Sequence, residues 1–209
     1  MFFRFFFLTL LITLVHPLVL TSRPAPSDRK FNSTAIEAVI TETKSIISNQ
    51  NLSVTFENCF PNTLDTTVEY SLDPKTNIPD TFVITGDIPA MWQRDSSHQV
   101  FPYVQFAPKD DKLKSMLLGV INGQKKNVLY DAYPNAFNKE PTGSPYDSDQ
   151  TTKIVNGKAV DAMQKIIWER KYEIDSVASI LRLATEYYFV TKDKSFIDDD
   201  WLTALRNFS

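Results

Sequence analysis

Apolar residues recur every three or four positions along much of the chain, which is the spacing of one face of an α-helix. The first such segment follows Ser33 or Thr34, either of which can cap a helix, and its apolar positions are Ile36, Val39, Ile40 and Ile47. A second segment, 110–126, begins with acidic and ends with basic residues, as the helix dipole favours. Its apolar face carries Leu113, Met116, Leu117, Val120 and Ile121. Both segments are predicted to be helices that pack on a core.

The strongest apolar periodicity lies in residues 173–191. One face of this predicted helix carries Ile174, Val177, Leu181, Ala184 and Tyr188, and a neighbouring face carries Ile180, Leu183 and Tyr187. The remaining stripe is polar and consists of Asp175, Ser179, Arg182 and Glu186. A helix with so narrow a polar stripe is predicted to be buried on most of its circumference. Another helix is predicted to begin at the acidic run 198–200, where the dipole is positive.

Three segments depart from helical spacing. Residues 81–92 are β-branched and aromatic and then interrupted by Gly86 and Pro89, which predicts a short strand that runs into a loop. Asp95 or Ser96 can cap the helix that follows, and Pro102 should kink or split it. Residues 127–159 are rich in Pro, Gly, Asn, Ser and Asp, and a loop of this length is more often functional than incidental. With no strand-rich region and no repeat, the chain is predicted to be mainly all-α, with paired helices, long loops and short strand segments.

Composition narrows the classes of partner and compartment. The 209 residues are 43% hydrophobic and 22% charged, with a net charge of −3, which is typical of a globular protein. Without a basic cluster, no nucleic-acid partner is expected. The single cysteine, Cys59, excludes an intrachain disulfide, and we expect it to be packed in the core.

The first 22 residues have the pattern of a secretory signal peptide or signal-anchor, because one Arg precedes a long apolar run. Residues 23–31 are predicted to be a linker and residues 32–209 the folded domain. No membrane contact is expected beyond a possible N-terminal anchor. Three Asn-x-Ser/Thr sequons, at Asn32, Asn51 and Asn207, permit N-glycosylation in that compartment. We therefore expect a protein of the secretory pathway, either secreted or anchored in the ER–Golgi lumen.

Several kinds of catalytic site are excluded by the residues present. One His outside the leader and one Cys leave no zinc site, and the chain has no Gly-rich phosphate loop, no G-x-S-x-G motif and no calcium loop. No metal and no cofactor are therefore expected. The remaining side chains are carboxylates, amides, arginines and tryptophans in loops, which suit the binding and hydrolysis of a sugar. The densest group lies in "MWQRDSSHQ", with Trp92, Arg94, Asp95, His98 and Gln99.

Three stretches, "ITGDIPAMWQRDSSHQVFPY", "DAYPNAFN" and "WERKYEIDS", occur in this order and together resemble glycoside hydrolase family 125. The resemblance covers residues 59–209. It implies a metal-independent, inverting exo-α-1,6-mannosidase with an (α/α)6 barrel and a mannose-containing oligosaccharide, N-glycan or mannan as partner. It also assigns the general acid to Asp175, within "EIDS". The resemblance implies that the substrate-binding residues are Trp92, Arg94, Asp95, Gln99, Asn135, Asn138 and Glu169.

The chain departs from the family pattern in three places. Gln93 stands where an apolar residue is usual, and Ala132 and Pro134 are interchanged relative to the usual order. The third departure is larger, because the inverting mechanism needs a second carboxylate as base. The family's base is a Glu far downstream, so we expect this chain to be an N-terminal fragment that forms the first half of the barrel and carries only the general-acid half of the site.

Two alternatives to the mannosidase remain open on the sequence. One is a non-catalytic mannan- or glycan-binding protein that keeps the pocket loops, and the other is a different (α/α)6 hydrolase of the glucoamylase type. Binding without turnover would favour the first, and a preference for α-glucosides would favour the second.

Overall fold

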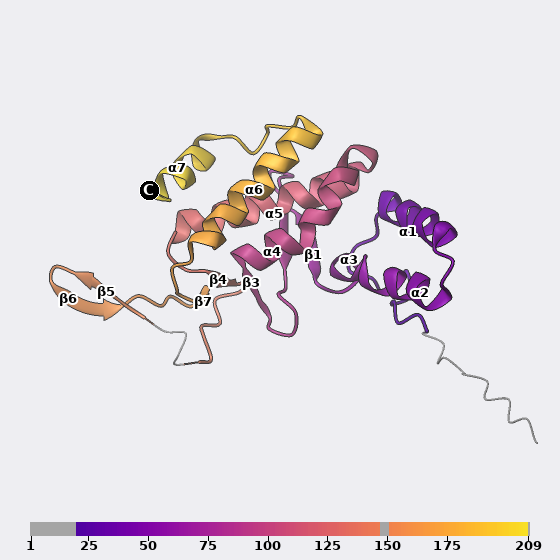
Figure 1. The fold of residues 1–209 in the computed structure, drawn as a ribbon. Coiled ribbons are helices and arrows are strands. Elements are labelled where there is room, and N and C mark those ends of the chain that lie inside the picture. Colours follow the sequence, from indigo (N-terminus) through magenta and orange to yellow (C-terminus); the bar gives the residue numbers. More distant parts are fainter. Residues whose placement is uncertain (1–19, 147–150, 209) are drawn as a thin grey trace, which may run out of the picture.

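The computed structural model describes residues 20–146 and 151–208. About half of this part of the chain is helical, and the longest helices are α5 and α6 (Figure 1). The α-helices are α1 (Thr34–Ile46), α2 (Gln50–Cys59), α3 (Asn62–Thr66), α4 (Gln93–Val100), α5 (Asp111–Tyr130), α6 (Ile174–Thr191) and α7 (Asp199–Asn207), and a 3-10 helix, η1, covers Phe101–Lys109. Helices α1 and α2 lie side by side at one end of the molecule.

Seven short strands lie between the helices within the described residues, as the predicted short strand segments led us to expect. They are β1 (Val68–Leu72), β2 (Pro79–Val83), β3 (Ala90–Trp92), β4 (Ala136–Asn138), β5 (Thr152–Val155), β6 (Lys158–Asp161) and β7 (Ile167–Glu169). All pairings are antiparallel: β1 with β2, β5 with β6, and a three-stranded sheet in the order β3-β4-β7. The hairpin β5–β6 projects from the body (Figure 1), and every one of its strand residues is exposed.

Helix α5 lies at the centre of the hydrophobic core and confirms the prediction for residues 110–126. Its predicted apolar face is buried throughout. The Asp110 carboxylate accepts a hydrogen bond from the backbone N–H of Leu113 at 3.0 Å and one from the Ser33 hydroxyl at 2.7 Å. Asp110 therefore caps α5 and at the same time fastens it to the start of α1, where Ser33 is the N-cap.

Strand β2 packs directly on α5 because the helix presents glycine there. A Cβ atom added to Gly119 would collide with the hydroxyl of Thr81, and one added to Gly123 would lie 3.2 Å from the carbonyl oxygen of Thr81. The Thr81 hydroxyl instead donates a hydrogen bond of 2.9 Å to the carbonyl of Met116. Glycines one helical turn apart thus allow a strand to approach the helix backbone closely.

Residues 23–31, predicted to be a linker, pack against the helices. The guanidinium of Arg23 lies between the carboxylates of Asp65, at 2.8 Å, and Glu37, at 2.7 Å, and its side chain is only 5% exposed. Phe31 is part of the core. The predicted leader, residues 1–22, falls almost entirely outside the described residues. No helix among the described residues is long and apolar enough to span a membrane.

Helix α4 begins earlier than predicted. Its N-cap is Trp92, and neither Asp95 nor Ser96 caps it. The physical reason is that β3 leads straight into the helix, and the backbone N–H of Gln93 already donates to the carbonyl of Asn135 at 2.9 Å. The predicted effect of Pro102 is confirmed, since α4 ends at Val100 and continues only as the 3-10 helix η1.

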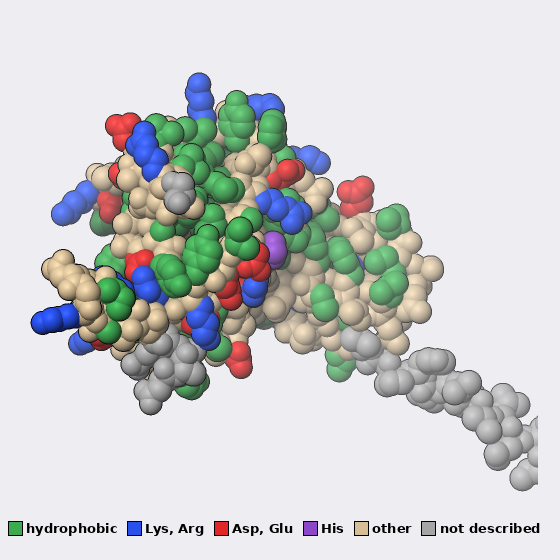
Figure 2. All heavy atoms as spheres, turned by 60° about the vertical axis from the view of Figure 1, so that its left-hand side comes forward, with side chains coloured by type: hydrophobic (Ala, Val, Ile, Leu, Met, Phe, Trp, Pro, Cys, Tyr) green, Lys and Arg blue, Asp and Glu red, His purple; other side chains and the backbone are tan. Residues whose placement is uncertain are grey.

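The predicted burial of α6 is wrong for one of its faces. Ile180, Leu183, Ala184 and Tyr187 are buried, and so is Ser179, which was assigned to the polar stripe. In contrast, Ile174 is 75% exposed, Phe189 60% and Tyr188 37%. Figure 2 shows many hydrophobic side chains on the surface of the body, with acidic and basic side chains between them. Cys59 is likewise exposed and not in the core, because it lies at the end of α2 on the surface.

The remaining predictions for the loops and the last helix have mixed outcomes. The segment 127–159 is not one continuous loop, because α5 runs on to Tyr130 and β4, β5 and the start of β6 lie within the segment. The helix predicted at 198–200 is confirmed as α7, whose N-cap Asp198 accepts a hydrogen bond from the N–H of Trp201 at 2.7 Å.

Candidate active site

The three-stranded sheet brings together side chains from three distant segments. Trp92 is the last residue of β3, Asn135 precedes β4 and Glu169 is the last residue of β7. The indole Nε1–H of Trp92 donates to Oε2 of Glu169 at 3.1 Å, and Nδ2 of Asn135 donates to the same oxygen at 2.6 Å. The Lys171 ammonium pairs with Oε1 of Glu169. These contacts place three of the predicted site residues in one cluster.

Glu169 is held as a carboxylate. Partial burial would raise its pKa, but the hydrogen bonds from Lys171, Asn135 and Trp92 outweigh burial and lower the pKa below the usual value of 4.5. Asn135 is itself 1% exposed, and its Oδ1 accepts a hydrogen bond from the backbone N–H of Lys171 at 3.2 Å. The cluster therefore presents a fixed anion next to an indole ring.

A second cluster lies where the first turns of α4 and α6 meet. Nη1 of Arg94 donates to Oδ2 of Asp175 at 2.9 Å. The same guanidinium lies 3.4 Å from Oδ2 of Asp95 and 3.9 Å from Oε2 of Glu173. The hydrogen bond from Arg94 lowers the pKa of Asp175 below its usual value of 3.8. Asp175 is 55% exposed, so it faces solvent as an ionised carboxylate in this arrangement.

The two clusters are joined through the backbone, because Trp92, Gln93 and Arg94 are consecutive. The Gln93 carbonyl accepts hydrogen bonds from the hydroxyl of Ser97 at 2.9 Å and from Nε2 of Gln124 at 3.1 Å. Its N–H is bonded to the Asn135 carbonyl. The strand-to-helix junction is thus rigid, and it sets the positions of Trp92 and Arg94 relative to one another.

Aromatic side chains surround these clusters. The rings of Trp92 and Trp168 pack edge to face with centroids 6.5 Å apart, and Tyr133 and Tyr172 lie 5.5 Å apart. Tyr133 is 47% and Tyr172 52% exposed, and the guanidinium of Arg170 lies 4.3 Å from the Tyr133 ring centroid. Exposed aromatic faces beside carboxylates and amides can bind the apolar face of a sugar ring.

Two other predicted residues, Asp95 and Gln99, lie one turn apart on α4. Oδ2 of Asp95 and Oε1 of Gln99 are both buried atoms without a hydrogen-bond partner among the described residues. Both are acceptors, and buried acceptors normally meet a donor, although the Arg94 guanidinium already lies 3.4 Å from Oδ2 of Asp95. A hydroxyl-rich ligand could supply such donors.

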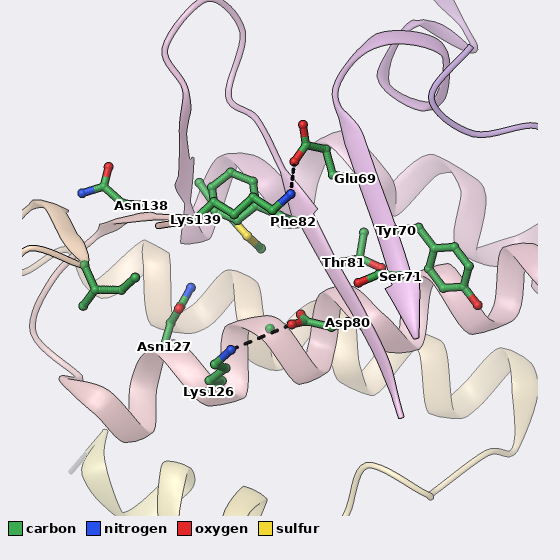
Figure 3. Close-up of a pocket in the computed structure, with 13 residues that line it drawn as sticks. Glu69, Tyr70, Ser71, Asp80, Thr81, Phe82, Lys126, Asn127, Asn138 and Lys139 are labelled. Atoms are coloured by element: carbon green, nitrogen blue, oxygen red, sulfur yellow. Dashed lines mark hydrogen bonds and ion pairs between the residues drawn. The ribbon is translucent and has the colours of Figure 1, made fainter. Parts of the chain in front are cut away.

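Asn138 does not join the candidate site. Its Nδ2 donates to the backbone carbonyls of Lys165, at 3.0 Å, and Gly143, at 3.2 Å, so its amide holds loop structure. Asn138 lines a different cavity of about 170 Å³, which lies between β1, β2 and the end of α5. In this cavity Lys139 pairs with Glu69 and Lys126 with Asp80 (Figure 3).

Sequence reasoning missed several members of the two clusters. Lys171 and Glu173 lie inside the "WERKYEIDS" stretch, and their charges were visible there, but their partners are set by the fold. Tyr133 and Tyr172 were missed because only their exposure next to the site distinguishes them from core aromatics. Among residues 20–146 and 151–208, no three His, Cys, Asp or Glu side chains are grouped so that they could hold a metal ion.

Comparison with known proteins identifies relatives. Residues 49–209 match the family described as metal-independent alpha-mannosidase (GH125). The chain is 40% identical over 185 residues to the "Meiotically up-regulated gene 157 protein" of Schizosaccharomyces pombe, covering 88% of this chain and 35% of that protein. It is also similar to a metal-independent alpha mannosidase from Streptococcus pneumoniae, solved in a non-productive complex with alpha-1,6-mannobiose. That similarity has a TM-score of 0.71 and 31% identity, covering 86% of this chain and 39% of the solved one.

The chain thus spans little more than a third of the length of these two relatives. Its helices correspond to part of the (α/α)6 barrel of the solved relative, as the sequence predicted. The match to the family profile covers well over half of the chain. The chain therefore belongs to the metal-independent α-mannosidase family of glycoside hydrolases, GH125.

Proposed function

We propose that this chain carries the general-acid half of a site that removes terminal α-1,6-linked mannose with inversion at the anomeric carbon. The observation that carries the proposal is the placement of Asp175. It lies at the head of α6, hydrogen-bonded to Arg94, which is two residues from the Trp92 indole that binds Glu169. The solved relative's complex with alpha-1,6-mannobiose supports the choice of substrate.

In the proposed reaction, protonated Asp175 transfers its proton to the glycosidic oxygen as the bond from that oxygen to the anomeric carbon breaks. Water attacks the anomeric carbon from the opposite face and gives its proton to a second carboxylate, about 6.5–9.5 Å from the acid. Glu169 is engaged by three donors, and Asp95 and Glu173 flank Arg94. We propose that the base belongs to the part of the relatives' domain that has no counterpart in this chain.

An acid must hold a proton, and Arg94 opposes that by lowering the pKa of Asp175. The proposal therefore includes a movement of the Arg94 guanidinium toward Asp95 or Glu173 when the sugar binds. Both carboxylates already lie within 4 Å of it. With Arg94 displaced and solvent excluded by the sugar, the pKa of Asp175 would rise, because desolvation disfavours the charged form.

The Glu169 cluster has a binding role in this proposal. Its carboxylate would accept hydrogen bonds from mannose hydroxyls, while Arg94, Asp95 and Gln99 would contact others. The exposed rings of Tyr133 and Tyr172 would face the sugar. Asn138 contributes only indirectly, by holding the loop through its bonds to Gly143 and Lys165.

The test is mannose release by the full-length gene product from α-1,6-mannobiose, with α-1,2-mannobiose and an α-1,6-linked glucose disaccharide as comparators. We expect hydrolysis of the first substrate and β-mannose as the first product seen by proton NMR. Initial α-mannose would contradict inversion. Binding of the mannobiose without any release would favour a glycan-binding protein, and faster cleavage of the glucoside would favour a glucoamylase-type enzyme.

We further propose that the protein enters the secretory pathway and is N-glycosylated. Asn32 and Asn207 are exposed and Asn51 is half-buried, so the first two are the better acceptors. Expression in a eukaryotic secretory host should give a product whose mass falls on treatment with peptide N-glycosidase. Retention of an unglycosylated protein in the cytosol would contradict this proposal.

A further inference from the structure

The side-chain amide of Gln93 is shielded from solvent and forms no hydrogen bond within the described part of the chain. Gln93 is 2% exposed, and both its Nε2 and its Oε1 are buried without a hydrogen bond among the described residues. Its backbone, in contrast, is fully bonded at both N–H and C=O. Because an unpaired amide is costly to bury, such a group normally meets another protein group or a buried water.

Gln93 lines a small, partly open cavity beneath the first turn of α6. The cavity has a volume of about 10 Å³, and its polar lining includes Glu173 and Ser176 along with Gln93. Val128, Ile180 and Phe208 provide apolar walls. A space of this size fits about one water molecule, and such a water needs two to four polar partners. The Gln93 amide, the Glu173 carboxylate and the Ser176 hydroxyl are partners of the right kind.

Glu173 connects this cavity to the Asp175 site. Its Oε2 accepts a hydrogen bond from the Ser176 hydroxyl at 2.9 Å and lies 3.9 Å from Nη1 of Arg94. The same Nη1 is bonded to Asp175. Glu173 therefore competes with Asp175 for the guanidinium of Arg94. A group that holds Glu173 in place influences which of the two carboxylates Arg94 binds.

We propose that Gln93 and one buried water hold the Glu173 carboxylate against Arg94, which makes Gln93 a positioning residue for the Arg94–Asp175 pair. The link to catalysis rests on the proposed role of Asp175, whereas the buried water does not. When Glu173 is held in place, it offers Arg94 an alternative partner, and Asp175 can be released to take up a proton.

The water itself is tested by a high-resolution crystal structure of the full-length protein. We expect a density peak within about 3.2 Å of the Gln93 amide and of Glu173 or Ser176. A dry cavity, or an amide bonded directly to protein, would overturn the proposal. This result does not depend on any enzymatic activity, so it separates failure of this inference from failure of the proposed function.

The positioning role is tested with Gln93→Met, which has a similar volume and no hydrogen-bonding amide. We expect kcat on α-1,6-mannobiose to fall about fivefold, the loss typical of one hydrogen bond, with KM little changed. The alkaline limb of the kcat/KM profile should move to lower pH, because Arg94 would stay with Asp175. A merely structural role would change thermal stability and leave that limb in place, which would overturn the proposal.

Two further variants complete the design. In Gln93→Glu the protonated carboxyl resembles the amide, so activity should recover toward the wild-type level as the pH falls. A uniform loss at all pH values would count against the proposal. Gln105→Met is the matched control, because Gln105 is exposed and its amide donates to the nearby backbone carbonyl of Pro102, and it should leave the pH profile unchanged.

Discussion

Nη1 of Arg94 lies 2.9 Å from Oδ2 of Asp175, although the two residues are 81 positions apart in the chain. Arg94 is the second residue of α4 and Asp175 the second residue of α6, so two positive helix ends meet at this pair. The arrangement favours a carboxylate over a carboxylic acid. A catalytic Asp175 therefore needs a way to release Arg94, and Asp95 and Glu173 provide alternative partners.

Replacing Arg94 by Met should raise the pKa of Asp175, because the hydrogen bond from Arg94 is the largest cause of its depression. Carbon-13 NMR titration of the aspartate carboxyl groups measures this directly. The matched control is Arg182→Met, since Arg182 stacks on the ring of Phe101 and not on a carboxylate. An Asp175 pKa that stayed the same in the Arg94 variant would show that the ion pair is not formed in solution.

Replacing Asn135 by Ala should destabilise the protein by about 1–3 kcal/mol, since a buried amide with both ends bonded is lost. The pKa of Glu169 is depressed below 4.5, so ionised Glu169 stabilises the fold above that pH, and this contribution is lost as the pH falls through the folded pKa. Without Asn135 the stability that is lost on acidification should be smaller. Urea unfolding at several pH values measures both effects, with exposed Asn62→Ala as the control.

Asp193, in the turn after α6, should contribute measurably to acid sensitivity. Burial would raise its pKa, but hydrogen bonds from Ser195, Lys114 and Tyr187 outweigh burial and lower the pKa from 3.8 to about 2. That shift corresponds to about 2 kcal/mol of stability at neutral pH. The contribution is present above 3.8 and disappears as the pH falls through the folded value of about 2.

The Asp193→Asn variant should therefore be less stable than wild type in urea at pH 7, and the two should converge near pH 2. Asp28→Asn, at an exposed position, serves as the control and should behave like wild type throughout. An equal difference at pH 7 and pH 2 would mean that packing, and not the charge, accounts for the effect.

The uncovered face of α6 should make this chain self-associate. Ile174 and Phe189 are 75% and 60% exposed, and exposed apolar patches favour association. The double variant Ile174→Ser/Phe189→Ser should sediment as a smaller species in analytical ultracentrifugation, while its unfolding free energy should change by less than about 1 kcal/mol, as is usual for surface positions. Unchanged sedimentation would contradict this, because it would show that the chain associates through another surface or does not associate.

The sequence was sufficient to predict a helix where all the determinants of that helix are local. For α5, the cap at Asp110, the acidic first turn and the apolar stripe are all local, and the helix starts as predicted, although it runs on past the predicted end at 126 to Tyr130. For α4 the start was misplaced, because the N–H of Gln93 is satisfied by the carbonyl of Asn135, 42 residues away, in place of a local side-chain cap. Local propensity cannot anticipate that contact.

The candidate site, too, could be predicted only where local sequence determines it. The motifs around Trp92 and Asp175 were found, and the fold brings Trp92, Asn135 and Glu169 together. Asn138, only three residues from Asn135, lies in a different cavity. Strands β4 and β7, which position these residues, are only three residues long. Strands this short show no recognisable alternation of apolar and polar residues in the sequence. Periodicity identified α6 as an amphipathic helix, but it misassigned Ser179, which is buried, and could not say which apolar residues the chain itself covers.

The central claim is that Asp175 protonates the departing glycosidic oxygen. The most direct test compares Asp175→Asn with wild type in the full-length protein on two substrates: α-1,6-mannobiose, whose leaving group needs a proton, and an aryl α-mannoside whose leaving group does not. We predict a loss of about 10²–10⁴-fold in kcat on the mannobiose and a much smaller loss on the aryl mannoside, with unchanged thermal stability. Equal losses on both substrates, or full activity on the mannobiose, would contradict the assignment.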